Sequence, residues 1–333
     1  MSAVETTPAT SRRRFSVFPR GRGAPPAGGT PQRQRRLVPR WLPYSLSGPA
    51  LLAIGLIIGA PLVVNVLESF QHYTSFNLIQ GIAGAWNGFT NYRDLVTTGG
   101  LLQVLYQTLL FTISTVGGTL ILGLALALLM RRASRRAQVF LSVSLVVCWA
   151  IPQVASTEVF IQLFNGAYGA IAWLLSGLHI NYPNAQHDWF ANGQVQLIMA
   201  AIMVIWGAVP FVALALFAGL LQIPDELYEA ARVDGASFLA QMRLVTVPLL
   251  LPILMLLTVL SVIWDAGVFN QVYIVDRAGG IGQNTTLGVF IFQVGIGQAN
   301  YGEGAAAGVV ATVLIGIVTF FAVRQMVKSS GAM

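Results

Sequence analysis

Long apolar segments alternate with short polar ones along this chain, and the alternation predicts a membrane protein. An α-helix needs about 20 apolar residues to cross a hydrocarbon core of about 30 Å, and six segments reach that length. Several contain Gly or Pro, which membrane helices tolerate because neighbouring helices satisfy the freed backbone groups. We therefore predict an all-α polytopic membrane protein with six transmembrane helices: Leu46–Leu67, Val104–Met130, Val139–Leu163, Val195–Leu221, Leu249–Phe269 and Ala305–Val327.

Residues 1–41 differ from the rest of the chain because they are polar and hold nine arginines. This composition predicts a disordered, basic tail, which suits anionic lipid better than nucleic acid because no folded soluble domain accompanies it. The first apolar run is membrane-length and lacks a small-residue cleavage site, so it does not read as a secretory signal. We expect a six-span domain at 42–328 and a short C-terminal tail at 329–333.

The distribution of positive charge predicts the orientation. The chain is 55% hydrophobic and only 9% charged, with a net charge of +7. With the N-terminus in the cytoplasm, seventeen of the nineteen Lys and Arg residues are cytoplasmic, and only Arg93 and Arg277 are external. This bias follows the positive-inside rule and predicts a multi-pass protein of the cytoplasmic membrane with both termini inside. The external loops would be Glu68–Leu102, Phe164–Gln194 and Asn270–Gly304.

The sequence lacks the residues that several kinds of chemistry require. The single cysteine, Cys148, excludes an intrachain disulfide, and three scattered histidines predict no metal site. The only lysine, Lys328, follows no Gly-rich loop, so the chain has no P-loop for ATP. No motif for a catalytic residue or a dinucleotide is present, so we predict no catalytic residue and no enzyme activity. If the chain is part of an ATP-driven pump, its ATPase is another polypeptide.

A charged segment, residues 222–248, separates the fourth and fifth apolar segments. Pro224 followed by two carboxylates predicts the start of a helix, since Pro fits the first turn and acids favour the N-terminal end of the helix dipole. Gly235 can adopt a positive φ and is expected to end that helix. A second helical run is then predicted from Ser237 until Pro248 and Pro252.

This segment resembles the cytoplasmic EAA loop of ABC-importer permeases. The family pattern is Glu-Ala-Ala, two residues, Asp-Gly-Ala and then a Pro about nine to eleven residues later. The Ile-Pro before it and the Leu-Leu-Leu-Pro after it look like the carbohydrate branch, which serves maltose, trehalose, glycerol-phosphate and similar solutes. The resemblance covers roughly Leu51 to Lys328. The matching residues are Glu229, Ala230, Ala231, Asp234, Gly235, Ala236 and Pro248.

The resemblance implies a non-catalytic permease subunit that forms half of the path of an ATP-driven importer for a sugar, such as the disaccharides trehalose or maltose. Its implied partners are a second homologous permease, a dimer of ATP-binding cassette ATPases, an extracytoplasmic solute-binding protein and membrane lipid, with no nucleic acid. ATP and Mg would be bound by the ATPase, and this chain would hold no cofactor.

The resemblance also assigns roles within the loop. Its first helix would be a coupling helix that sits in a groove of the ATPase, where Glu229 pairs with a cation. Ala230 and Ala231 would allow close approach, and Asp234 and Gly235 would set the turn. Closure of the ATPase would then move this helix and its spans as a rigid body.

Polar side chains within the spans mark candidate solute contacts, because their burial in lipid is costly. Asp265 and Glu158 are the acids placed within spans. An alternative is that both lie near the outer interface, hydrated or paired with Arg93 or Arg277. The stretch 264–270 resembles the cavity-lining part of the fifth span in sugar permeases, although that family more often has a plain polar or aromatic residue at position 265. The candidate substrate path is Trp264, Asp265, Asn270, Gln271 and Trp206.

Three alternatives remain open from sequence. Importers of polyamines, phosphate or metals share a shorter version of the loop. A stand-alone secondary transporter would use the intramembrane acids for ion coupling, but it gives the loop no role. A scaffolding membrane protein is the third.

Overall fold

The computed structural model describes residues 42–178, 189–190, 193–279 and 285–330. The chain divides into two compact units, residues 1–54 and residues 55–333. In the first unit the described part is helix α1 (Leu42–Ile54), which contains Pro49. The predicted basic tail, residues 1–41, lies outside the described residues.

The described residues are predominantly helical, and five helices are long and apolar enough to cross a membrane. This confirms the prediction of an all-α polytopic membrane protein, because each spanning segment satisfies its own backbone hydrogen bonds. Each of the five falls on a predicted span. They are Ser47–Glu68, Leu101–Arg132 (α5), Gly193–Leu220 (α9), Phe238–Asp276 and Tyr301–Met326, the last within α15 (Tyr301–Ser330).

The third predicted span is not straight. It consists of α6 (Arg135–Trp149) and α7 (Gln153–Leu163), which are bent by 95° and count as a sixth span only if taken together. The bend lies at Pro152, which has no N–H for the helix and disfavours helical geometry at the residue before it. A proline inside an apolar segment was expected to be tolerated in a straight span, and at Pro152 the helix is broken instead.

The fifth span also departs from its prediction. Helix α11 (Phe238–Gln241) and the π-helical turn η2 (Met242–Thr246) run directly into α12 (Val247–Ala266). The helix was expected to end at Pro248 and Pro252, but it continues through both. Pro248 lies in the first turn of α12, where its missing N–H is tolerated, and the wider turn η2 precedes it.

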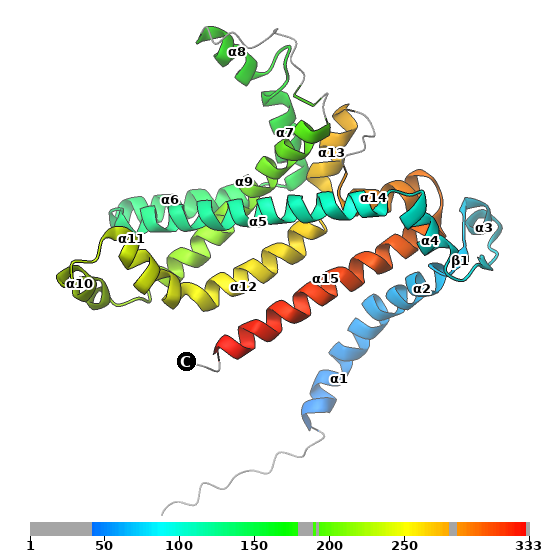
Figure 1. Cartoon of the computed structure of the whole chain (residues 1–333), viewed down its shortest axis with the longest axis horizontal. Helices are drawn as coiled ribbons and strands as arrows, with labels where there is room; N and C mark the ends of the chain where they lie inside the picture. The colour runs from blue at the N-terminus through cyan, green and yellow to red at the C-terminus, as the bar shows by residue number, and fades with distance from the viewer. Residues whose placement is uncertain (1–41, 179–188, 191–192, 280–284, 331–333) are drawn as a thin grey trace, which may run out of the picture. The chain divides into compact units, whose positions relative to one another are not determined.

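Helices α5, α9 and α12 form the centre of the second unit, with α15 beside α12 (Figure 1). Small residues bring α5 and α9 together: a Cβ added at Gly123 would lie 2.7 Å from Cγ1 of Val212. Such residues let membrane helices approach closely, and the resulting packing stabilises their association because the hydrophobic effect contributes little within a bilayer. One core cluster fills this contact, with Ala127, Met130, Leu216, Leu220 and Leu250 all nearly inaccessible.

The segments predicted as external loops contain short helices of their own. Between α2 (Ala60–Glu68) and α5 lie α3 (Ser75–Gln80), α4 (Thr90–Thr97) and the two-residue strands β1 (Gln71–His72) and β2 (Ala85–Trp86). Asn91 ties α4 to this region by donating to the carbonyl oxygens of Ser69 and Gln71, at 2.9 Å each.

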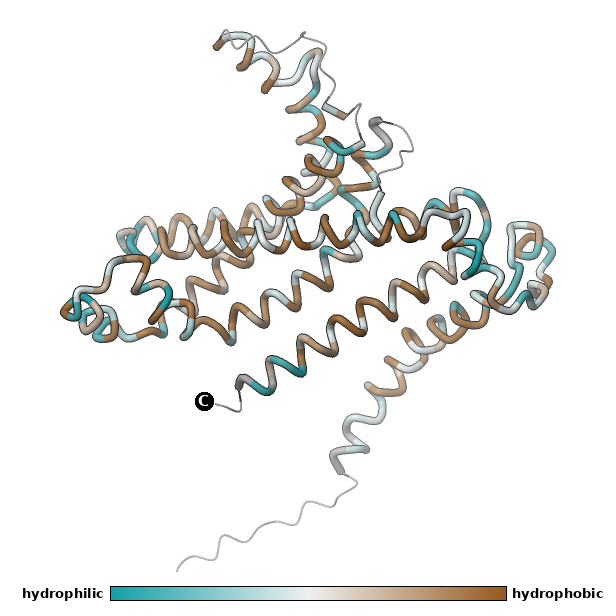
Figure 2. The backbone as a smooth tube through the Cα atoms, viewed as in Figure 1, coloured by the Kyte–Doolittle hydropathy of each residue, from teal (hydrophilic) through white to brown (hydrophobic). Residues whose placement is uncertain are grey.

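After α7 come α8 (Ala170–Gly177) and, past α12, α13 (Asn270–Gly279), α14 (Leu287–Phe292) and the π-helical turn η3 (Gln293–Gly297). Figure 2 shows hydrophilic residues around α10 (Asp225–Val233) and around α3 and α4, and mostly apolar residues along the helices between them.

Candidate functional site

Helix α10 has the ends that its sequence predicts. Pro224 caps its start, and Asp225 and Glu226 lie in its first turn, where carboxylates favour the helix dipole. At its other end Gly235 has a φ of 77°, the left-handed conformation that glycine adopts without strain. The amides of Gly235 and Ala236 donate to the carbonyl oxygens of Arg232 and Ala231, at 3.0 and 2.9 Å. These two bonds are a Schellman motif, which fixes the direction in which the chain leaves α10.

The residues that match the family pattern lie on a free surface of the described structure. Glu229, Ala230, Asp234 and Gly235 are exposed, and Ala231 and Ala236 are half-buried. Apolar side chains accompany them, with Leu227 43% exposed and Val233 88% exposed. The residues of the pattern are therefore accessible to another protein.

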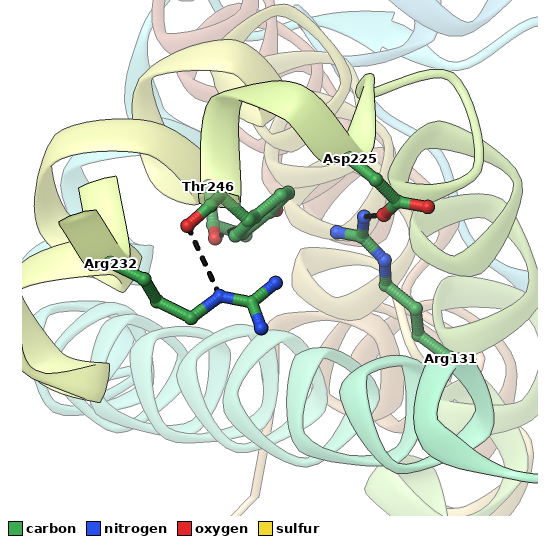
Figure 3. Close-up of polar contacts among 5 residues, drawn as sticks. Arg131, Asp225, Arg232 and Thr246 are labelled. Atoms are coloured by element: carbon green, nitrogen blue, oxygen red, sulfur yellow. Dashed lines mark hydrogen bonds and ion pairs between the residues drawn. The ribbon is translucent and has the colours of Figure 1, made fainter. Parts of the chain in front are cut away.

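Helix α10 is fastened to the spans by Tyr228 and its neighbours. Asp225 accepts a hydrogen bond of 2.8 Å from Arg131 at the end of α5 (Figure 3). The guanidinium of Arg131 lies 4.2 Å from the ring centre of Tyr228, within the range of a cation–π contact. The hydroxyl of Tyr228 lies 3.0 Å from that of Thr246, at the start of α12. Tyr228 thus contacts both α5 and the α12 segment.

A cavity of about 490 Å³ lies beside these contacts, lined by residues of α5, α10, α11 and η2. Arg132 lines it, with its guanidinium 4.8 Å from the ring centre of Phe238. Arg232 also lines it and donates to the carbonyl oxygen of Tyr228 at 3.2 Å. Two arginine–aromatic contacts therefore hold the loop to the end of α5, one at Tyr228 of α10 and one at Phe238 of α11, and a hydrated lysine would replace either arginine poorly.

Sequence reasoning missed Arg131, Tyr228 and Thr246 as members of this site. In the sequence, Arg131 is one of the seventeen basic residues predicted to be cytoplasmic, with no further role. Its partner Asp225 is 94 residues away in sequence, so no local spacing connects them. The one signal was an aromatic residue directly before the Glu-Ala-Ala pattern, on a short charged helix.

A second cavity, of about 450 Å³, lies among α6, α9, α12 and the start of α13. Four residues of the predicted substrate path line it: Trp264, Asp265, Asn270 and Gln271. The fifth, Trp206, is not among its lining residues. Its ring packs against Phe160 of α7, with ring centres 5.2 Å apart. Trp206 therefore contacts α7 and does not line the cavity.

Three aromatic rings from three different helices meet at this cavity. Phe211 of α9 lies with its ring centre 5.8 Å from that of Trp149 on α6 and 5.8 Å from that of Trp264 on α12. All three line the cavity, together with Phe269 and polar Gln153 and Ser261. The sequence did not reveal Trp149, Phe211 and Ser261 as part of this site, because residues on different spans show no common spacing.

Asp265 is buried, with 5% of its surface exposed. Its carboxylate interacts with Thr115 of α5, while its Oδ2 atom has no hydrogen-bond partner among the described residues. Asp265 therefore lies against the cavity, and no ion pair joins it to Arg93 among the described residues; its depth relative to the outer interface stays a prediction. Glu158, by contrast, is exposed and does not line the cavity. Among the described residues no cluster of His, Cys, Asp and Glu is arranged to hold a metal ion.

Comparison with known proteins identifies the class of chain that carries these two sites. Residues 119–329 match the family described as binding-protein-dependent transport system inner membrane component. The chain is 35% identical over 301 residues to the diacetylchitobiose uptake system permease protein DasB of Streptomyces coelicolor, covering 90% of this chain and 91% of that protein.

It is also 30% identical over 228 residues to the trehalose/maltose transport system permease protein MalF of Thermococcus litoralis, covering 68% of this chain and 75% of that protein. Among solved structures, a chain of a bacterial ABC transporter that imports the acidic polysaccharide alginate has the same fold. The TM-score is 0.67 at 17% identity, over 86% of this chain and 96% of that chain.

Proposed function

The chain belongs to the family of binding-protein-dependent transport system inner membrane components, and we propose that it forms half of the translocation path of an ATP-driven sugar importer. In this proposal the loop 222–248 receives the motion of a separate ATPase, and the cavity at Asp265 receives the solute. The observation that carries it is that the same two spans, α5 and α12, join the loop to the cavity.

Helix α12 lines the cavity itself, and α5 reaches the cavity through the contact of Thr115 with Asp265. On α5, Arg131 holds α10 and Thr115 contacts Asp265, 16 positions earlier in the chain. On the α12 segment, Thr246 contacts Tyr228, and Asp265 follows 19 positions later. At a rise of 1.5 Å per residue these separations are about 24 Å and about 28 Å. A displacement of α10 would therefore reach the cavity through two helices that are continuous between the two points.

The exposed surface of α10 suits docking to an ATPase. Glu229 is exposed and forms no ion pair among the described residues, so it can pair with a cation of the partner. Ala230 and Ala231 add little bulk between the two backbones. The Schellman motif at Gly235 keeps the helix end from fraying, so a push on α10 moves it as one body.

The composition of the cavity suits a sugar. Carbohydrates present hydroxyl groups that need hydrogen-bond partners and apolar ring faces that pack on aromatic side chains. The cavity offers both, with the rings of Trp149, Phe211 and Trp264 beside the polar groups of Asp265 and Gln271. The relatives named above transport diacetylchitobiose and trehalose/maltose, so we propose an oligosaccharide of disaccharide size and leave its identity to experiment.

The proposal includes the partners of such an importer. They are a second permease that completes the path, an ATPase pair that binds ATP and Mg, and an external solute-binding protein. The cytoplasmic side is the side of α10, in agreement with the position of the basic residues. This chain would carry no catalytic residue, because hydrolysis occurs on the ATPase.

Two alternatives are kept as outcomes of a test. An importer of a polyamine or phosphate would share the loop but not require aromatic faces in the cavity. A stand-alone ion-coupled transporter would use Asp265 for ion coupling, but α10 would then have no partner. The family to which the chain belongs does not support this second alternative. The test is affinity purification of the full chain followed by uptake of labelled disaccharides in a deletion strain. The proposal expects a co-purified ATPase and ATP-dependent disaccharide uptake; a chain that transports alone contradicts it.

A further inference from the structure

The cavity of about 490 Å³ beside α10 is lined by three arginines but by only one carboxylate, that of Asp225. Arg131 and Arg132 end α5, and Arg232 lies in the last turn of α10. The carboxyl end of a helix favours cations, which explains a basic residue at each of these two ends. It does not explain why cations from two helices line one cavity, because like charges repel one another unless an anion lies between them.

The single carboxylate leaves most of this positive charge uncompensated. The described residues contain one salt bridge, which joins Arg131 to Asp225. Arg132 and Arg232 therefore have no acidic partner among those residues. The Arg131 side chain is only 19% exposed, whereas that of Asp225 is 85% exposed, so water screens the negative charge of the pair more than the positive one. With three cations against one anion, the lining of the cavity favours a further anion.

The three guanidinium groups also have N–H donors that the described residues leave unused. Arg131 donates from Nη2 to Asp225, and Arg232 donates from Nε to the carbonyl oxygen of Tyr228. Among the described residues these two groups make no other hydrogen bond, and Arg132 makes none. The unused nitrogen atoms of Arg131 are not closed off from solvent, and Arg132 and Arg232 are exposed residues. These donors are therefore within reach of a ligand.

The arginines are also held in place for a ligand. The side chains of Arg131 and Arg232 extend toward one another from α5 and α10 (Figure 3). The guanidinium groups of Arg131 and Arg132 lie 4.2 and 4.8 Å from the ring centres of Tyr228 and Phe238. A guanidinium that packs on an aromatic ring through its flat face keeps its N–H groups, which lie in the plane, available for hydrogen bonds. An anion between the two helices could therefore accept hydrogen bonds from both.

Phosphate is the anion that these donors suit best. A phosphate monoester carries about −1.5 to −2 charges at pH 7 and three strong acceptor oxygens, and guanidinium groups bind it through paired hydrogen bonds. A carboxylate has a single charge and two oxygens in one plane, so it cannot serve donors from three directions equally. The volume of about 490 Å³ lies in the range of sites for small molecules, which leaves room for the group that carries the phosphate.

We propose that this cavity binds the phosphate group of a small phosphorylated compound or of a lipid headgroup, and that the bound phosphate fastens α10 to α5. The phosphate would contact Arg131 and Arg132 of α5 and Arg232 of α10, so its binding adds a second attachment to the one made by Tyr228. Any effect of the ligand on transport rests on the proposed coupling role of α10. The binding itself does not, and it is measured without transport.

Binding is measured by thermal unfolding of the detergent-solubilised full chain, without the ATPase, which binds phosphate compounds itself. Inorganic phosphate, glucose 6-phosphate and acetate are titrated at constant ionic strength. A ligand of the folded chain raises Tm as its concentration passes the dissociation constant. In a second arm, micelles contain phosphatidic acid or diacylglycerol, which differ only in the phosphate. We expect a rise in Tm with the phosphate compounds of at least one arm, and little or none with acetate or diacylglycerol.

The two arms distinguish the source of the phosphate. A response to the free compounds supports a soluble ligand, and a response to phosphatidic acid alone supports a lipid headgroup. Both results support the phosphate site.

Substitutions locate the binding at this cavity. Arg132→Gln and Arg232→Gln are each expected to weaken phosphate binding about 10- to 100-fold, the loss typical of one hydrogen bond to a charged group. Arg232→Lys keeps the charge without the paired donors, so it should weaken binding less than Arg232→Gln. Arg136→Gln is the control, since it removes an equal charge from an exposed residue of α6 outside the cavity and should leave the dissociation constant unchanged. The ligand-induced shifts in Tm are compared, because Arg132→Gln also loses its contact with Phe238.

Equal shifts with acetate and with the phosphate compounds would overturn the inference, since they would reflect general screening of charge. So would the absence of a shift in both arms, or phosphate binding that is unchanged in Arg132→Gln and Arg232→Gln. If Arg132→Gln does not fold, Arg232→Gln decides the question, because it alters an exposed helix end. Phosphate binding to a chain that transports without an ATPase would contradict the proposed function and leave the phosphate site standing.

Discussion

Arg131 and Asp225 are 94 residues apart in the chain, yet their side chains form an ion pair of 2.8 Å that joins α5 to the first turn of α10. The two partners differ in burial: the Arg131 side chain is 19% exposed and that of Asp225 is 85% exposed. An exposed carboxylate is screened by water, so the ion pair itself contributes at most about 1 kcal/mol. The packing of Arg131 on Tyr228 is the firmer part of the junction.

Substitutions at the junction should therefore have unequal effects. Asp225→Asn is expected to lower the free energy of unfolding by less than about 1 kcal/mol, since water screens the lost charge. Tyr228→Phe, which removes only the hydroxyl group near Thr246, should cost about 1 kcal/mol. Tyr228→Ala should cost more than either, because it also removes the face under Arg131. Thermal unfolding of the detergent-solubilised chain measures all three; an Asp225→Asn loss larger than that of Tyr228→Ala would contradict this order.

Glu229 should matter for docking and not for folding. Glu229→Gln is expected to lower the affinity of the chain for its ATPase about tenfold or more, because the partner's cation loses its charged acceptor at a desolvated contact. The thermal stability of the isolated chain should not change, since Glu229 is exposed.

The control for that experiment is Glu226→Gln, which removes an equal charge one turn earlier on the same exposed helix. It should leave most of the affinity intact. The affinity of both variants is measured as the amount of ATPase retained on the immobilised permease. An equal loss of affinity in the two variants would contradict the prediction, since the contact would then depend on the negative charge of α10 as a whole and not on Glu229.

Gly123 should be needed for the contact between α5 and α9. Gly123→Ala places a methyl group against Val212 and is expected to destabilise the chain by about 1–3 kcal/mol, the usual cost of overpacking. Val212→Ala in the same chain makes room and should recover part of the loss. Gly117→Ala on the same helix meets nothing within 4 Å and serves as the control. Failure of Val212→Ala to recover stability, seen in thermal unfolding, would place the strain elsewhere.

The sequence predicted the class of fold and both ends of α10 because these depend on local signals. Apolar length gives the spans, and a Pro before two acids and a Gly at a left-handed position give the ends of α10. The 95° break at Pro152 was not predicted, because a proline inside an apolar run is equally compatible with a straight membrane helix. Only tertiary packing decides between the two.

The candidate sites were predicted in part for the same reason. Asp265, Asn270 and Gln271 lie close together in sequence, so one stretch revealed them. Trp149 and Phe211 come from other spans and reach the cavity only through packing. The contact between Arg131 and Tyr228 also could not be predicted, because the two residues come from different segments. The roles assigned to Glu229 and to the other residues of the loop remain predictions, since they concern a partner chain.

The central claim is that α10 transmits the work of an ATPase to the cavity, and Gly235 offers the most direct test. Gly235→Val should strain the left-handed turn, at a conformational free-energy cost of at least about 1–2 kcal/mol. The chain would then leave α10 in a different direction. Gly81→Val is the matched control: Gly81 caps α3 with a φ of 65°, also meets nothing within 4 Å, and lies outside the loop.

The measurement is the amount of sugar taken up per ATP hydrolysed, in proteoliposomes that hold the full chain with its co-purified partners and the solute-binding protein. We expect Gly235→Val to hydrolyse ATP with little uptake, and Gly81→Val to keep the wild-type ratio. A Gly235→Val complex that assembles and transports with the wild-type ratio of sugar to ATP would contradict the claim.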